Sequence, residues 1–480
     1  MANSVPEGAP TSPIRKRRQS NVDVDAIHDD PGSESMAPAQ LYATESGQLF
    51  HSGKLAIVTV GLPARGKTHI SVALLRYLRW LGVKTRAFHL GDYRRAHMGE
   101  GKDVPADYFH VNASPSSQAI RKMILEKCWM DLHHFFDEEN GQIAIYDAVN
   151  PLAKGRKKLE EEFRKKGIQT IFIESYVDDP KIIEQNVRNV KISSPDYANW
   201  DPDAAVQDYI RRINIKIPDF ETITDSTQSY IKMINAGKRI IVNRCRFGYL
   251  PQRMVFYLMN LHIQSRKTYF ARAGISAQED SYRADAPLCK AGREYSKRLI
   301  DALMKHREQE YKEALEEGSD DPETPLAVWT STRRRTVQTA EPFIQAGLKI
   351  KQRPQMSQLN PGDAEKLDDE QIQEMYPEEW EKHQLDPFHH RYPRGESYHD
   401  LAVRMEPIIL ELERDKNDLI IIAHESVLRV MYGYLMACST QDIPTLMFPR
   451  NEIVEIIPAS YINRAKRIPI PGVKPSGEIV

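Results

Sequence analysis

Short apolar runs rich in isoleucine and valine recur along this chain in two series, and this pattern constrains the fold more than any other feature. Each run is followed by a helical stretch of mixed apolar and charged residues. Continuous apolar strands that alternate with helices are typical of a parallel sheet covered by helices on both faces. The chain has 480 residues, more than one hydrophobic core usually supports, so we predict two α/β domains. The first series is LAIVTV (Leu55–Val60), IAIYDAV (Ile143–Val149) and TIFIES (Thr170–Ser175), and the second is KTYFAR (Lys267–Arg272), LAVWTS (Leu326–Ser331) and DLIIIAH (Asp418–His424).

Composition sets the expected boundaries of these domains. We place an N-terminal domain at residues 49–265 and a second domain at 266–465, followed by a Pro-rich tail at 466–480. Residues 1–48 are rich in Ser, Pro, Asp and Gly, so we expect them to be disordered because they cannot bury enough apolar surface. Within them, RKRRQS places Ser20 where a basophilic protein kinase could phosphorylate it. A solvated basic run or a nuclear-import patch explains the same residues equally well.

Charge and cysteine usage exclude several classes of protein. The formal net charge of -1 gives no overall attraction to nucleic acid or to a membrane, so any anion site must be local. The four cysteines lie far apart and form no CxxC pair, which fits a reducing compartment and argues against a disulfide or zinc framework. No apolar run is long enough to span a bilayer, and the N-terminus lacks the apolar core of a signal peptide. We expect a cytoplasmic protein that binds neither nucleic acid nor membrane.

The segment GLPARGKT (Gly61–Thr68) matches G-x-x-x-x-G-K-[ST], follows an expected strand directly and opens a helical stretch, as a phosphate-binding loop requires. Its glycines let backbone N–H groups point at phosphate oxygens, and the helix N-terminus adds partial positive charge. In such a loop Lys67 reaches the transferred phosphoryl group and the Thr68 hydroxyl holds Mg²⁺. The strand before and the helix after count against the alternative, a glycine turn with a surface lysine. We predict an ATP site formed by Gly61, Leu62, Pro63, Ala64, Arg65, Gly66, Lys67, Thr68 and His69.

Charged residues follow the ends of several expected strands. Asp147 ends the run IAIYD, at the sheet edge where open α/β folds bind ligands. There it could orient Mg²⁺ or take a proton from an acceptor hydroxyl, although an Asp after a strand is equally typical of a helix cap. Arg94 follows the expected strand TRAFHL, and Arg121, Lys191 and Arg212 supply further cations downstream. Single arginines are usually solvated, but several near strand ends fit a phosphorylated sugar better than a neutral acceptor.

The motif GLPARGKT is followed along the chain by GDYRR, YDAVN, NVRNVKISSPDY and RYPRGESY. This ordered set, from about Leu55 to Ser460, resembles the 6-phosphofructo-2-kinase/fructose-2,6-bisphosphatase family. The resemblance implies an N-terminal P-loop kinase domain and a C-terminal domain of the histidine phosphatase (phosphoglycerate-mutase-like) fold. Such kinases use MgATP to phosphorylate O2 of fructose 6-phosphate, and the product, fructose 2,6-bisphosphate, controls glycolysis. The phosphatase half removes the same phosphate through a phosphohistidine, and the enzymes are homodimers.

The resemblance also implies roles for matching positions. Lys67, Asp147 and Lys191 would be catalytic, with Mg²⁺ held by Thr68 and Asp147, and Asn186–Lys191 would lie along the nucleotide. The implied ATP contacts in that segment are Asn186, Arg188 and Lys191, and the implied fructose 6-phosphate contacts are Arg94, Arg121, Lys191 and Arg212.

Three positions depart from the family pattern on the acceptor side. The family's Thr two residues after the catalytic carboxylate is Val149 here, and its Arg eight residues after that carboxylate is Gly155, with Arg156 beside it as a substitute. A sugar-contacting Tyr is replaced by Lys216. Each loss could weaken the acceptor site by about 1 kcal/mol or more. The departures therefore bear on the sugar rather than on ATP.

The second half has lost its reacting groups. Where the family has Arg-His-Gly-Glu, this chain has Arg272-Ala273-Gly274-Ile275, and the proton-donating Glu of an L-N-E segment is Pro361. Removing one member of a catalytic unit costs several orders of magnitude, so we predict negligible bisphosphatase activity. The remaining cations either maintain the fold or form a ligand-sensing site, and the sequence does not separate the two. They are Arg272, Arg335, His424 and Arg429.

These observations leave more than one function open. The leading hypothesis is a kinase that acts on ATP and fructose 6-phosphate with Mg²⁺. A second is a non-catalytic regulator that binds ATP or a sugar bisphosphate, which the three acceptor-side departures support. A third pairs a P-loop kinase with a phosphatase-like domain that acts on nucleic-acid ends, and the near-neutral charge and the lack of a basic, aromatic stripe count against it.

Overall fold

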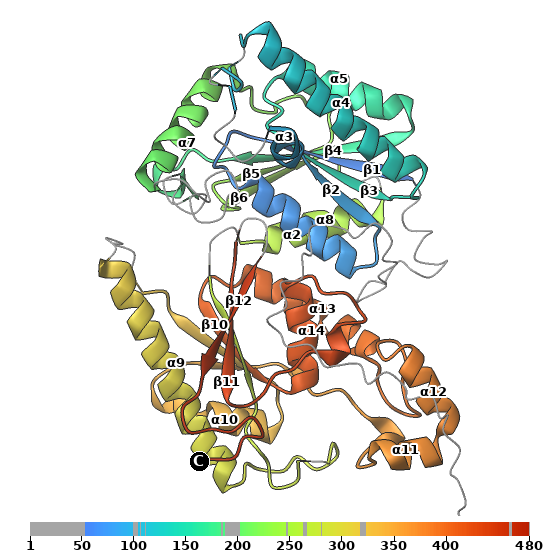
Figure 1. The fold of residues 1–480 in the computed structure, drawn as a ribbon, viewed down its shortest axis with the longest axis vertical. Coiled ribbons are helices and arrows are strands. Elements are labelled where there is room, and N and C mark those ends of the chain that lie inside the picture. The colour runs from blue at the N-terminus through green and yellow to red at the C-terminus, as the bar shows by residue number, and fades with distance from the viewer. Residues whose placement is uncertain are drawn as a thin grey trace, which may run out of the picture.

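The structure is a computed structural model, and it describes residues 53–98, 104–105, 107–110, 112–183, 186–187, 202–245, 248–262, 266–279, 281–316, 323–459 and 463–479. The expected disordered segment at residues 1–48, including Ser20, lies outside this set. None of the described helices has the length and apolar character needed to cross a lipid bilayer. Two six-stranded sheets, each with helices on both faces, form the two domains seen in Figure 1, as predicted.

The first sheet has the strand order β2-β3-β1-β4-β5-β6, in which β1 to β5 are parallel and β6 is antiparallel to β5. The antiparallel edge strand was not predicted from the sequence. The strands are β1 (Lys54–Val60), β2 (Thr85–His89), β3 (Ile143–Asp147), β4 (Ile168–Tyr176), β5 (Tyr230–Ile234) and β6 (Arg239–Asn243). Within the described residues, the helices of this domain are α2 (Lys67–Trp80), α3 (Leu90–Met98), α4 (Pro115–Asp137), α5 (Ala153–Lys165), α7 (Pro202–Lys216) and α8 (Tyr249–Asn260).

Strand β1 lies in the middle of this sheet and is buried on both faces. Leu55 and Ile57 pack with the helices α2 and α8, whereas Ala56 and Val58 pack with the aromatic residues of α4 and α5. A strand covered on both sides needs apolar residues at every position, which explains the unbroken run LAIVTV. The carboxyl end of β1 therefore emerges between two layers of helices, at the edge where ligands bind in such folds.

The second sheet has the order β12-β11-β7-β10-β8-β9, with β11 and β12 antiparallel to their neighbours at one edge. Helices α9 and α10 cover one face, and α13 and α14 cover the face toward the first domain (Figure 1). The strands are β7 (Thr268–Arg272), β8 (Leu326–Thr330), β9 (Ile350–Gln352), β10 (Asp418–Ala423), β11 (Glu452–Ile457) and β12 (Arg464–Pro469). The helices are α9 (Lys290–Glu316), α10 (Arg334–Gln345), α11 (Asp369–Met375), α12 (Pro377–Leu385), α13 (Tyr398–Arg414) and α14 (Glu425–Leu435).

The Pro-rich segment 466–480, predicted to be a tail, is packed onto the second domain in its described part, so that prediction is wrong. Most of β12 falls within it, and β12 pairs along its whole length with β11. Beyond the strand, Ile470 and Val473 are buried, and the Ser476 carbonyl accepts a hydrogen bond from Arg450. Prolines are tolerated here because an edge strand does not need every backbone N–H for its ladder.

The two domains meet through helices rather than through a loop alone. Helix α2 contacts α14, and α8 contacts α13, so the apolar core of the first domain continues without a break into that of the second. Tyr77 of α2 stacks on Tyr257 of α8, with ring centroids 4.2 Å apart. The hydroxyl of Tyr257 lies 3.2 Å from that of Tyr434 on α14. The helix that follows the phosphate-binding loop is thus also a wall of the interface between the domains.

Candidate active site

The predicted phosphate-binding loop lies between β1 and α2, as the motif requires. Gly61 has φ 148° and Gly66, the residue before α2, has φ 81°, both in the region that favours glycine. A Cβ at Gly61 would lie 2.6 Å from the backbone oxygen of Ser175, so a larger residue would have to displace β4. Lys67 and Thr68 are the first residues of α2, and the first N–H groups of a helix have no acceptor within the helix itself.

Three side chains converge on the carboxylate of Asp147, which lies at the end of β3 and is 8% exposed. The Thr59 hydroxyl donates to Oδ1 over 2.9 Å, and the Thr68 hydroxyl donates to Oδ2 over 3.0 Å. Nδ1 of His89, at the end of β2, lies 2.8 Å from Oδ2. The ends of three neighbouring strands thus place polar groups around one buried carboxylate, next to the first turn of α2.

The charges of this cluster are set by burial and by one another. Burial raises the pKa of Asp147, but His89, Lys67 and Thr59 together bring it below its ordinary value, so the carboxylate is ionised. Burial lowers the pKa of Lys67 to about 8, because Asp147 offsets only part of the cost of burying its charge. Burial also lowers the pKa of His89, but its bond to Asp147 outweighs this effect and raises the pKa overall. The site therefore places an ionised carboxylate between Lys67 and His89, beside the predicted phosphate-binding loop.

Other predicted ATP residues lie around the same loop. The Nζ of Lys67 donates to the carbonyl of Leu62 over 2.8 Å, and Nδ2 of Asn186 donates to the carbonyl of Ala64 over 2.9 Å. Arg65 is buried and donates to the carbonyl of Pro63. Arg188 and Lys191 lie outside the described residues.

The side chain of His69 points elsewhere. It lines a cavity of about 50 Å³ between the domains, together with Arg76 and Glu413. Burial, followed by the charge of Arg76, lowers its pKa to about 4. The backbone N–H of His69 remains in the first turn of α2, so only the backbone of this residue belongs with the phosphate loop.

Two of the arginines predicted to bind the sugar lie near the same segment, residues 108–110. Arg94 on α3 is buried, with its guanidinium carbon 5.4 Å from the ring centroid of Phe109. Arg121 on α4 donates to the carbonyl of His110 over 3.0 Å. Both charges act on the phenol of Tyr108, whose pKa is nevertheless raised because burial outweighs them. The side chains of Arg212 and Lys216 and all of Lys191 lie outside the description, so the structure brings together only this half of the predicted acceptor set.

Arg156, the proposed substitute for the missing arginine at Gly155, is turned into the protein. It is 2% exposed and donates to the carbonyls of Asn150 and Pro151 over 2.9 and 2.8 Å. These carbonyls belong to the loop after β3, which also contains Val149. Arg156 therefore supports the loop that follows Asp147.

In the second domain, the predicted cations gather at the carboxyl ends of β7 and β10. Arg272 ends β7, and the methyl group of Ala273 follows it, with only 4% of the residue exposed. His424, directly after β10, is buried, and its Nε2 lies 3.5 Å from the Ser331 hydroxyl. Burial, followed by the positive charges around it, of which Arg335 is the strongest, holds the pKa of His424 well below its usual range. The imidazole is neutral, and the side chain beside it that would form a phosphoenzyme is a methyl group.

Pro361 occupies the position predicted for the proton donor. It immediately precedes the short 3-10 helix Gly362–Ala364 and carries no ionisable group. Gly362 has φ 63°, and a Cβ there would lie 2.3 Å from the backbone oxygen of Pro393. The loop is thus tightly packed.

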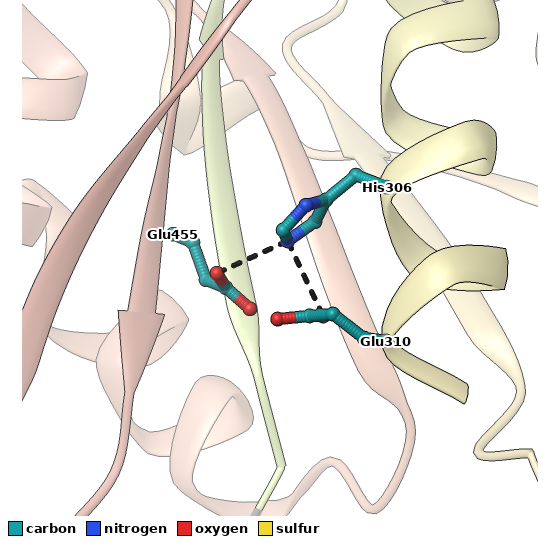
Figure 2. Close-up of side chains that lie close together, drawn as sticks. All are labelled: His306, Glu310 and Glu455. Carbon is teal, nitrogen blue, oxygen red and sulfur yellow. Dashed lines mark hydrogen bonds and ion pairs between the residues drawn. The ribbon is translucent and has the colours of Figure 1, made fainter. Parts of the chain in front are cut away.

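A third cluster of titratable groups has the residue types of a metal site. Figure 2 shows His306 and Glu310 of α9 facing Glu455 of β11; Nε2 of His306 lies 3.2 Å from Glu310 and 3.3 Å from Glu455. Lys267 lies 2.6 Å from Glu310 and 3.2 Å from Glu455. Hydrogen bonds to both carboxylates raise the pKa of His306 to about 9, so the nitrogen that a metal would need holds a proton at neutral pH. Two cations neutralise two carboxylates here, and we assign the cluster to the stability of the fold.

Several residues of both sites were not predicted from the sequence. Thr59 and His89 lie near the ends of their strands, and the signal for them was a polar residue at the carboxyl edge of a parallel sheet. Glu279, Glu425 and Arg450 lie among the arginines of the second domain, and no local motif marks them.

Comparison with known proteins agrees with this two-part architecture. The family model described as 6-phosphofructo-2-kinase matches residues 42–265, and the model of the histidine phosphatase superfamily (branch 1) matches residues 268–467. The Saccharomyces cerevisiae protein YLR345W is 43% identical over 464 residues, which cover 94% of this chain and 90% of the relative. The 6-phosphofructo-2-kinase/fructose-2,6-bisphosphatase of Gallus gallus is 36% identical over 410 residues, covering 84% and 82%, and isoform 4 of Rattus norvegicus is 35% identical over 426 residues, covering 88% and 86%. With both halves matched in order and nearly the full length aligned, the chain belongs to the 6-phosphofructo-2-kinase/fructose-2,6-bisphosphatase family.

Proposed function

We propose that the protein transfers the γ-phosphate of ATP to O2 of fructose 6-phosphate, and that its phosphatase-like half hydrolyses little or no fructose 2,6-bisphosphate. One observation carries the kinase half of this proposal: Lys67, Thr68 and the ionised Asp147 lie together at the mouth of a phosphate-binding loop. Lys67 would stabilise charge on the moving phosphoryl group, and Lys191 is proposed to assist it.

Magnesium is the metal that this donor set fits. The Thr68 hydroxyl and the Asp147 carboxylate offer hard oxygen atoms 3.0 Å apart, the ligand type that Mg²⁺ prefers. When bound with ATP, the ion would neutralise phosphate charge. Asp147 would orient the site or accept the proton of the acceptor hydroxyl, and His89 and Thr59 fix its position for either task.

Fructose 6-phosphate is the acceptor that the cations favour. Arg94 and Arg121 approach the same segment from two helices, which suits a phosphorylated sugar, and Arg212 and Lys191 are proposed to complete the set. A neutral sugar would offer these guanidinium groups no phosphate to bind.

The absence of hydrolysis follows from two missing groups. The position of the nucleophile holds Ala273, and that of the proton donor holds Pro361. Ala273→His alone should not restore turnover, because Pro361 still has no proton to give. Substantial hydrolysis of fructose 2,6-bisphosphate by that variant would show that the acid has been wrongly assigned.

The kinase proposal is tested with purified protein, MgATP and fructose 6-phosphate, scored for an acid-labile fructose 2,6-bisphosphate product. We expect product from the wild type and a loss of roughly 10²-fold or more in Lys67→Met and Asp147→Asn. Lys54→Met is a matched control, because Lys54 starts β1, the strand that leads into the loop, but pairs with Asp137 on the surface. Equal synthesis by wild type and Lys67→Met would refute the proposal.

A non-catalytic regulator is the second candidate, and Arg156 favours it. With its guanidinium bonded to two loop carbonyls, Arg156 does not stand in for the arginine lost at Gly155. If ATP binds with a measurable affinity but no product forms at any fructose 6-phosphate concentration, this candidate replaces the kinase.

We further propose a cytoplasmic homodimer whose residue Ser20 is a substrate for a basophilic protein kinase. Strand β6 lies at one edge of its sheet, and Val242 on it is 43% exposed, which offers a surface for strand pairing. Light scattering after size exclusion should give twice the mass of one chain, and a single-chain mass at micromolar concentration would contradict the dimer.

A further inference from the structure

The arginines of the phosphatase-like pocket are already paired with carboxylates of the same chain. Glu425 lies 3.2 Å from Arg272 and 3.2 Å from Arg429. Glu279 contacts Arg450 and lies 3.7 Å from Arg335. Two carboxylates thus bridge four guanidinium groups, on segments that are far apart in the sequence.

Both carboxylates are held in place by further contacts. Glu425 lies in the first turn of α14, where the partial positive charge of the helix N-terminus favours an anion, and its Oε1 accepts from the backbone N–H of Phe448 over 3.2 Å. Glu279 is fixed by Arg450, which also donates from Nε to the carbonyl of Ala273 over 2.8 Å. The position that has lost its nucleophile is thereby tied to the same network.

Further contacts engage some of the other donors of these arginines. Arg272 donates to the carbonyl of Phe448. Arg429 donates to the carbonyl of Leu446 and to the hydroxyl of Tyr398, both over 2.7 Å. Arg335 bonds to the side chain of Gln358. A phosphate that entered would have to displace existing partners as well as approach two negative charges.

We propose that Glu279 and Glu425 are internal anions that occupy the arginine cluster and exclude phosphate and phosphate esters from the second domain. Loss of the nucleophile explains why bound substrate would not react, whereas this network explains why it would not bind. A carboxylate and a phosphate form the same kind of charge-assisted hydrogen bond with a guanidinium group. In this partly buried site, the charge of each glutamate would also repel an anion that approached the arginines it contacts. The inference does not depend on the kinase activity of the first domain.

The test uses full-length protein and inorganic phosphate, measured by titration calorimetry. All proteins carry Lys67→Met, so that phosphate binding at the loop of the first domain is weakened. Without further changes we expect no saturable binding up to millimolar phosphate. Glu279→Gln and Glu425→Gln keep the shape of each side chain but remove its charge, and together they should tighten phosphate binding by roughly 100-fold or more.

Two further variants locate the effect. Glu308→Gln removes the same charge from an exposed position on α9, where Glu308 pairs with Lys312, and should change nothing. Adding Arg335→Ala to the double glutamine variant should abolish the gained binding, because it removes a cation of the pocket. Thermal unfolding of each protein shows whether it is folded.

Several results would overturn the proposal. The Lys67→Met parent protein could show saturable phosphate binding that is lost on Arg335→Ala. This result would show that the arginine cluster is an open anion site, and it needs no glutamine variant to fold. A folded double variant without a gain in affinity would contradict it equally. If the double variant does not fold, Glu279→Gln alone decides, since the Glu279 side chain is 32% exposed and its change should be tolerated; a gain of roughly tenfold supports the proposal and no gain refutes it.

Discussion

The ion pair between Arg76 and Glu413 gives the sharpest test of how the two domains are joined. Nη2 of Arg76 on α2 lies 2.6 Å from Oε1 of Glu413 on α13, and their side chains are 12% and 9% exposed. The Tyr434 hydroxyl donates to the same Oε1 over 2.7 Å, and the guanidinium carbon of Arg76 lies 4.9 Å from the Tyr434 ring centroid. Arg76→Met keeps the aliphatic volume and leaves the Glu413 charge buried beside the tyrosines.

The expected cost follows from that uncompensated charge. Breaking a buried pair by removing one partner costs about 3–5 kcal/mol, and we expect the lower end because Arg266 also acts on Glu413. For a domain of about 150–250 residues, each kcal/mol lowers Tm by about 2–4 °C. Arg76→Met should therefore lower Tm by roughly 6–12 °C in differential scanning calorimetry of the full chain.

A double-mutant cycle separates charge from packing. Glu413→Gln in the Arg76→Met background removes the stranded carboxylate but keeps an acceptor for Tyr434, so most of the lost Tm should return. If Arg76→Met changes Tm by less than about 2 °C, the pair does not hold the domains together. If the double variant has a lower Tm than Arg76→Met, the unpaired charge of Glu413 is not the cause of the lowered stability.

The other predictions concern protonation and packing. Because the pKa of Lys67 is about 8 in the free protein, its positive charge is lost as the pH rises through that value. The affinity for ATP, measured with a fluorescent analogue, should therefore fall from pH 7 to 9. Lys67→Arg should make the affinity less dependent on pH. The pKa of His306 is raised to about 9 from an ordinary 6.5, so its contribution to stability is full below pH 6.5 and is lost as the pH rises through 9. His306→Gln should remove that part of the pH dependence of the free energy of unfolding in denaturant. An unchanged pH dependence would contradict the assignment of the His306 cluster to the stability of the fold. Gly292→Ala would place a Cβ 2.2 Å from the backbone oxygen of Ile275 and should cost about 1–3 kcal/mol, whereas Gly155→Ala on α5, with nothing within 4 Å, should be neutral or slightly stabilising; equal Tm values for the two variants would refute the steric argument.

Local patterns predicted the parts of the site that depend on neighbouring residues. The phosphate-binding loop needs glycines at fixed spacing between a strand and a helix, and all of these lie within Leu55–Trp80. Asp147 was found because it ends an apolar run. Its partners were not, since His89 reaches Asp147 only because β2 and β3 pair in the register that sets these two residues side by side.

Long-range contacts account for the main failures. The bridging of distant arginines by Glu279 and Glu425 depends on the order of strands in the second sheet, which no local pattern reveals. The same holds for the segment 466–480, whose prolines suggested a tail. Its first residues lie in β12, which pairs with β11. The pairing therefore depends on the residues of β11 as much as on those of the segment itself.

The continuous core between the domains gives the second domain a structural task that does not depend on catalysis. On the side of α2 and α8 that faces the second domain, Tyr77, Trp80 and Tyr257 are almost fully buried. A chain cut after α8 would present this aromatic surface to water and invite aggregation. The second domain therefore covers the aromatic surface of the first, and this task depends on the shapes of α13 and α14 rather than on any reactive group.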